Sequence, residues 1–180
     1  MITPRDALRR FDLVATRAEL RSLGITPYEL TAAVRAGEIV RVRRGWYAHP
    51  KADDRIVRVV RVGGRLACVS ALRFHGIWAV DDGRLHVHVP ESASRLRSQL
   101  DRHVALGDRA LGGVVMHRDM SGSDSRLCCS VIHALSQYLR EHSDEFGVAA
   151  LDSALHSRAV TPGAAQPTAP GTPAALPNAV

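Results

Sequence analysis

The chain has 180 residues, of which 46% are apolar, and its formal net charge is +6. An apolar fraction of this size is enough for the core of one or two small domains, so we expect a globular protein. We find no charged-then-apolar signal region at the N-terminus and no apolar run of the roughly 20 residues needed to span a bilayer, which excludes a membrane protein and favours a cytoplasmic one.

The positive charge is concentrated in the N-terminal third of the chain. Residues 1–65 contain fourteen Arg or Lys and seven Asp or Glu, a balance of +7, whereas the remaining 115 residues hold ten against eleven, a balance of −1. A basic excess confined to one segment is typical of a nucleic-acid-binding face.

Two short helices are predicted within this basic segment. The T-x-x-E pattern of a capping box occurs at Thr16 and again at Thr26, the second time with Pro27 at the first helical position. Gly24 and Gly37 stand where the two helices should end. Two helix starts so close together predict a helix-turn-helix.

A hairpin is predicted directly after these helices. Apolar residues flank Arg43-Arg44-Gly45, a pattern that indicates two strands around a tight turn. An amphipathic segment, Asp6 to Phe11, precedes the motif and is expected to form the first of three helices. Residues 1–50 are therefore predicted to form a winged helix-turn-helix domain.

In such a domain the second helix of the motif enters the major groove of double-stranded DNA, and basic side chains hold the phosphates. The candidate DNA-binding residues are Arg17, Thr26, Tyr28, Thr31, Ala32, Arg35, Arg41, Arg43 and Arg44. Among them we expect sequence readout first from Tyr28, Thr31, Ala32 and Arg35, and contacts with the backbone or minor groove from Arg41, Arg43 and Arg44. The alternative is an ordinary helical hairpin beside a two-stranded sheet with solvated arginines. A homodimer is also considered, because many helix-turn-helix proteins bind two half-sites as dimers.

Residues 51–158 are predicted to form a small α+β domain. Its helices are expected at Asp53 to Val62, from a cap at Ser70 to His75, at Ser125 to Leu139 and at Asp144 to Ser157, and its strands before Ser70 and within GRLHVHVPES and GGVVMHRD. Residues 159–180 contain five of the nine prolines and no charge. They are expected to be a disordered tail. The helices and strands predicted for the rest of the chain make the overall fold class α+β.

The histidines of the first long strand raise the question of a metal site. His86 and His88 alternate with apolar residues and are expected on the exposed face of the strand, where they could meet His117 if the strands pair. Two histidines on one strand face bind zinc when a third ligand arrives, but histidines on an exposed strand face are routine. We therefore expect no metal and no cofactor.

The three cysteines do not change that expectation. Cys68, Cys128 and Cys129 are an odd number, adjacent Cys128 and Cys129 cannot form a relaxed loop disulfide, and no CxxC pair is present for zinc. Such free thiols fit a reducing compartment.

A hydrolase triad can be drawn from Ser70, His75 and Asp81 or Asp82. However, Ser70 resembles a helix cap and the aspartates a turn, and the nucleophile lacks the sharp elbow that such enzymes use. The protein is therefore not expected to be an enzyme.

Several segments resemble a known family, the AbiEi-type antitoxins of type IV toxin-antitoxin and abortive-infection systems. The resemblance is carried by TRAELRSLGIT, AAVRAGEIVRVRRGWYA and CVSALRFHGIW, and it extends over roughly residues 10 to 162. A related group continues through strands like LHVHVPES and VVMHRD and a helix like VAALDSALHSRAVT, and then adds a nuclease-like domain of the very-short-patch-repair type.

The resemblance implies a regulator that represses its own operon and counteracts a nucleotidyltransferase-like toxin. The sequence after Ala159 does not match the nuclease-like domain, and the single lysine, Lys51, lies just past the hairpin, so DNA cleavage is not expected. The alternatives left open are a module that neutralises a toxin by direct contact and a truncated, inactive relative of the nuclease-bearing group.

Overall fold

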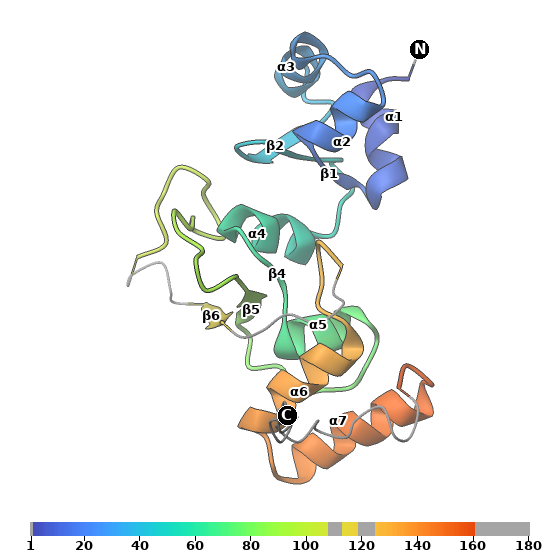
Figure 1. Ribbon diagram of the computed structural model, residues 1–180, viewed down its shortest axis with the longest axis vertical. Helices are drawn as coiled ribbons and strands as arrows, with labels where there is room; N and C mark the ends of the chain where they lie inside the picture. Colours follow the sequence, from blue (N-terminus) through green and yellow to red (C-terminus); the bar gives the residue numbers. More distant parts are fainter. Residues whose placement is uncertain (1, 108–112, 119–124, 161–180) are drawn as a thin grey trace, which may run out of the picture.

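The computed structural model describes residues 2–107, 113–118 and 125–160, which form a mixed α+β structure (Figure 1). The predicted tail lies outside the described residues from position 161 onward. None of the helices in the described part of the chain combines the length and apolar character needed to cross a membrane.

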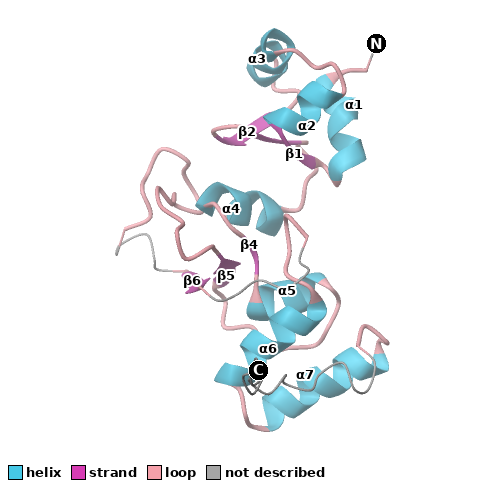
Figure 2. Cartoon of the chain, viewed as in Figure 1, coloured by secondary structure: helices cyan, strands magenta, loops and turns pink. Residues whose placement is uncertain are grey.

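The N-terminal elements alternate helices with the strands of one small sheet (Figure 2). They are α1 (Pro4–Leu8), a 3-10 turn (Arg9–Phe11), β1 (Val14–Thr16), α2 (Arg17–Ser22), α3 (Pro27–Arg35), β2 (Val40–Arg43) and β3 (Trp46–Ala48). β3 lies in the middle of the sheet and is antiparallel to both β1 and β2. The two helices and the hairpin lie where the sequence predicts them, whereas the three-residue strand β1 was not predicted.

A second three-stranded sheet follows, with helices before, within and after it. These elements are α4 (Asp54–Val62), β4 (Arg65–Leu66), α5 (Cys68–Phe74), β5 (Leu85–His88), β6 (Val114–His117), α6 (Val131–Glu141) and α7 (Glu145–His156). β5 is central, antiparallel to β4 and parallel to β6. In Figure 1, α4 lies between the N-terminal elements and the α5–α6 pair.

Most helix starts follow from caps that the sequence contains. The side chain of Asp53 accepts a hydrogen bond from the Arg55 N–H at the start of α4, and Asp144 accepts one from the Phe146 N–H at the start of α7. Both starts agree with the predicted ones.

Two predicted helix starts are wrong. Ser70 does not cap α5, because the helix already begins at Cys68 and the Ser70 hydroxyl instead accepts a hydrogen bond from the His86 N–H at 3.0 Å. α6 begins at Val131 rather than near Ser125, because the residues before Val131 are bonded to β4. The Leu66 carbonyl accepts a hydrogen bond from the Cys129 N–H, and the Leu66 N–H donates one to the Leu127 carbonyl.

The expectation for strand β5 is also wrong. All four of its residues are buried, and His86 and His88 are only 3% and 1% exposed. The supposed solvent face is covered by α5 and α6: His86 is bonded to Ser70 of α5, and the His88 ring lies 5.2 Å from that of His133 in α6. Burial therefore removes the main sequence argument against a metal site, which was exposure of these histidines.

The buried apolar residues form two clusters. The smaller lies among α1, α2 and α3 and includes Leu8, Leu20 and Leu30. The larger surrounds α4 to α7 but also takes in Val14 and Val42 of the first sheet. The first sheet thus packs on both clusters. The larger cluster contains residues from both sides of residue 50, the predicted domain boundary.

Candidate nucleic-acid interface

Helices α2 and α3 are set by two complete capping boxes. The Thr16 hydroxyl accepts a hydrogen bond from the Glu19 N–H while the Glu19 carboxylate accepts one from the Thr16 N–H at 2.7 Å. Thr26 and Glu29 repeat the arrangement, again with a 2.7 Å bond to the carboxylate. Because both helix starts are closed by local bonds, the turn between the helices is well defined.

One face of α3 is open to solvent. Leu30 is buried in the smaller cluster, which anchors the opposite face of the helix. The exposed face carries residues at i, i+3, i+4 and i+7 spacing, namely Tyr28, Thr31, Ala32 and Arg35. These four candidates therefore share a single surface that an external ligand can reach.

Internal hydrogen bonds engage the hydroxyls of two candidates, Thr26 and Thr31, and fix the backbone of a third, Arg17. The Thr26 hydroxyl is engaged with Glu29 in the capping box, and the Thr31 hydroxyl donates to the Pro27 carbonyl at 2.9 Å. The Arg17 backbone N–H donates to the Gly45 carbonyl at 2.8 Å, which places this exposed residue beside the turn of the hairpin.

The hairpin β2–β3 carries three arginines in different environments. Arg41 and Arg44 are exposed, whereas Arg43 is half-buried against the C-terminal end of α4. There Gly63 has a φ of +113°, and a Cβ at this position would collide with the Arg43 guanidinium. Burial, aided by the nearby positive charge of Arg97, lowers the pKa of Arg43 from its ordinary value.

These hairpin arginines line a cavity of about 530 Å³ together with a later loop of the chain. The loop contributes residues that lie about 50 or more positions away in the sequence: Ser94, Arg95, Arg97, Arg102 and His103. Of the described residues that line the cavity, none is acidic. The site is thus suited to a polyanion such as a phosphate backbone.

Two hydrogen bonds hold this loop beside the hairpin and the end of α4. The Arg102 guanidinium donates to the Arg41 carbonyl at 2.8 Å, and the Arg97 N–H donates to the Val62 carbonyl at the end of α4 at 3.1 Å. Arg95, Arg97 and Arg102 were not among the predicted DNA-binding residues, because the net charge of residues 66–180 is slightly negative. The closely spaced arginines of S-R-L-R and D-R-H were the only signal.

The residues weighed for a hydrolase triad have other partners. The Ser70 hydroxyl bonds to the His86 N–H, the His75 Nε2 lies 2.8 Å from the Cys129 carbonyl, and Asp81 pairs with Arg73 at 3.3 Å. The structure therefore gives each of them a structural contact.

Comparison with known families identifies the N-terminal segment. Residues 2–50 match the model of the family described as "Transcriptional regulator, AbiEi antitoxin", which confirms the resemblance noted in the sequence for this part of the chain. The match ends at residue 50, shortly after β3, so it includes α3 and the hairpin but not the loop at residues 94–103. No curated protein matches the chain.

Proposed function

Since residues 2–50 match antitoxin-type transcriptional regulators, we propose that the protein is a sequence-specific regulator that binds double-stranded DNA through a winged helix-turn-helix formed by residues 1–50. α2 and α3 would be the helix-turn-helix, and β2–β3 the wing. Repression of its own operon, as in type IV systems, is the regulation that fits the family. The function is therefore binding and not catalysis.

The observation that carries the proposal is the pairing of an exposed α3 face with an arginine-lined hairpin. Tyr28, Thr31, Ala32 and Arg35 would face base edges in the major groove, and Arg41, Arg43 and Arg44 would hold phosphates. Arg17 would contact the backbone beside the hairpin turn, and Thr26 would act by fixing the start of α3. Arg95, Arg97 and Arg102 would extend the phosphate contacts beyond the family segment.

The salt dependence of DNA binding tests this proposal. Arg41 and Arg44 are exposed, so replacing both by alanine removes charge without opening a core. We expect Arg41→Ala with Arg44→Ala to weaken binding to all duplex sequences and to reduce the slope of log affinity against log salt by about 0.9 for each lost phosphate contact. Fluorescence anisotropy over a salt series measures both quantities.

A matched control removes the same charge from the other part of the molecule. Arg73 and Arg158 are exposed and lie outside the cavity. The variant Arg73→Ala with Arg158→Ala should keep the slope of the unmodified protein. Absence of any affinity for duplex DNA at low salt, or equal slopes for the two double variants, would refute the DNA-binding proposal.

The same basic cavity favours a second candidate function, contact with acidic side chains of a protein such as a nucleotidyltransferase-like toxin. Antitoxin families suggest both kinds of partner. A neutralisation assay with the same variant separates the two functions. If the unmodified protein has no affinity for DNA and Arg41→Ala with Arg44→Ala loses toxin neutralisation, the protein partner is favoured.

A further inference from the structure

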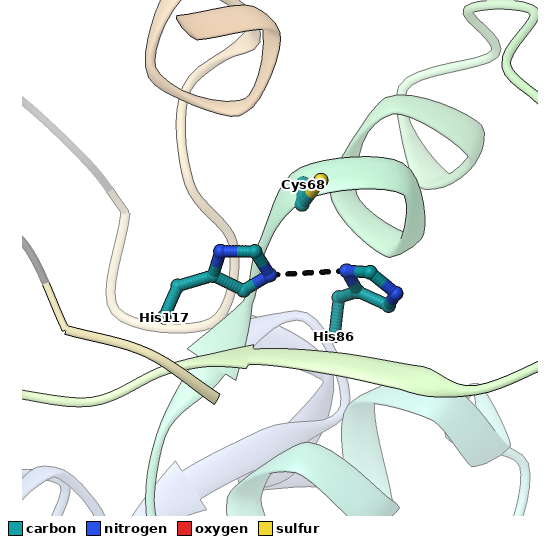
Figure 3. Close-up of side chains that lie close together, drawn as sticks. All are labelled: Cys68, His86 and His117. Atoms are coloured by element: carbon teal, nitrogen blue, oxygen red, sulfur yellow. Dashed lines mark hydrogen bonds between the residues drawn. The ribbon is translucent and has the colours of Figure 1, made fainter. Parts of the chain in front are cut away.

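Three potential metal ligands meet beneath helices α5 and α6. Cys68 is the first residue of α5, His86 lies in β5 and His117 ends β6, and all three side chains are buried (Figure 3). The cluster lies outside the basic cavity and outside the family segment. Its three residues come from three elements of the larger core, α5, β5 and β6, and the site is independent of any DNA contact.

The donor atoms have the spacing that a small cation requires. The Cys68 sulfur and one ring nitrogen from each histidine lie within 4.8 Å of one another, and the His86 Nδ1 is 3.0 Å from the His117 Nε2. Two histidine nitrogens on one tetrahedral zinc ion stand about 3.3 Å apart, given Zn–N bonds of about 2.0–2.1 Å. Small side-chain shifts would therefore admit an ion between them.

Each histidine has a carboxylate beside its outward nitrogen. The His86 Nε2 lies 3.1 Å from the Asp82 carboxylate, and the His117 Nδ1 lies 3.8 Å from the Glu141 carboxylate. Carboxylates in this position orient histidine ligands and make the inward nitrogen a stronger donor.

Glu141 also approaches the third ligand. Its second oxygen lies 4.0 Å from the Cys68 sulfur, so one carboxylate at the end of α6 is adjacent to two of the three donors. Cys68 itself is held at a φ of +44°, with its N–H donating to the Gln137 side chain at 2.8 Å. A strained non-glycine residue placed by a specific hydrogen bond indicates that the position of this side chain matters.

We propose that Cys68, His86 and His117 bind one divalent transition-metal ion of the zinc class through Sγ, Nδ1 and Nε2. A mixed sulfur and imidazole donor set favours zinc over magnesium or calcium, which prefer oxygen ligands. The ion would join α5, β5 and β6, with the Glu141 carboxylate as the nearest further donor. Cys68 gives up its thiol proton on binding.

A second group of the same composition provides the matched control. His88, Cys129 and His133 also lie within 4.8 Å of one another, and the Nε2 of His133 is 3.1 Å from the neutral Gln137 amide nitrogen. The proposal concerns the first group, in which both histidines lie beside carboxylates. Cys68→Ala and Cys129→Ala therefore remove equivalent side chains from the two groups.

The test is zinc uptake by the full chain after treatment with a chelator, measured by equilibrium dialysis with elemental analysis. We expect His117→Gln and Cys68→Ala each to lose one equivalent of zinc relative to the unmodified protein, and Cys129→Ala to retain it. With Co²⁺ in place of zinc, a sulfur-to-cobalt charge-transfer absorption should appear and should be absent in Cys68→Ala. Circular dichroism establishes that each variant is folded.

A surface variant keeps the test decisive when a buried variant does not fold. Glu141 is exposed, and Glu141→Gln should weaken zinc binding about ten- to a hundred-fold, the usual effect of losing a carboxylate behind a ligand. The proposal is overturned if the unmodified chain takes up no zinc, if folded His117→Gln binds as much zinc as the unmodified chain, or if Glu141→Gln has unchanged affinity.

Discussion

Tyr28 is an aromatic side chain with 83% of its surface exposed, on the N-terminal turn of α3. An aromatic ring in this position adds nothing to the core, and its exposure is easiest to understand if a ligand covers it. The neighbouring exposed residues, Thr31, Ala32 and Arg35, offer a hydroxyl acceptor, a methyl group and a guanidinium. These are the kinds of group that contact base edges in the major groove.

We expect Tyr28→Ala to change the preference among DNA sequences. Loss of a base contact should alter the relative free energy of binding to matched and mismatched sites by about 1–3 kcal/mol, whereas Arg44→Ala should weaken binding to both sites equally. Competition assays with a selected site and its single-base variants measure the difference. If Tyr28→Ala leaves the ranking of sites unchanged, Tyr28 does not read the sequence.

The helices of the N-terminal segment were predictable because their determinants are local. Each capping box links residues three positions apart, and the turn of the hairpin is contained within Arg44-Gly45. The short strand β1 was missed because its pairing partner, β3, lies about thirty residues later. Likewise the burial of His86 and His88 could not be recognised from the sequence around them. The strand is covered by α5, which precedes it, and by α6, which follows much later in the chain.

The capping box of α3 makes a stability prediction. Replacing Thr26 by alanine removes the hydroxyl that accepts from the Glu29 N–H, which should lower the free energy of unfolding by about 1 kcal/mol. Thr31→Ala is the matched control, because it removes a hydroxyl from the same helix without affecting its cap. Urea denaturation at neutral pH measures both variants, and equal midpoints would contradict the role of the cap.

The same box makes the effect dependent on pH. Hydrogen bonds from the backbone N–H and the hydroxyl of Thr26 lower the pKa of Glu29 below its ordinary value. A carboxylate whose pKa is lowered on folding stabilises the fold above its unfolded pKa, and this stabilisation is lost as the pH falls through the folded pKa. The difference between Thr26→Ala and the unmodified protein should therefore shrink in acid below the ordinary pKa of Glu29.

The two core clusters are joined by contacts that no single segment of the sequence reveals. Arg126 lies just before α6 yet donates to the Phe11 carbonyl at 2.8 Å and the Val14 carbonyl at 2.6 Å. Its guanidinium also pairs with Glu19 of the first capping box at 3.0 Å. One side chain of the later part thus binds three groups of the N-terminal segment and joins that segment to the rest of the molecule.

Substitution of Arg126 should consequently lower the stability of the fold. Its side chain is 31% exposed, so the hydrogen bonds are partly shielded from water, and hydrogen bonds to a charged donor are worth about 1.5–3 kcal/mol. We expect Arg126→Ala to lower the free energy of unfolding by about 2 kcal/mol, and Arg126→Lys to recover only part of it because an ammonium group cannot reach all three acceptors at once. Urea denaturation measures the free energy of unfolding of both variants. If Arg126→Ala unfolds at the same urea concentration as the unmodified protein, the bonds of Arg126 do not contribute to holding the N-terminal segment in place.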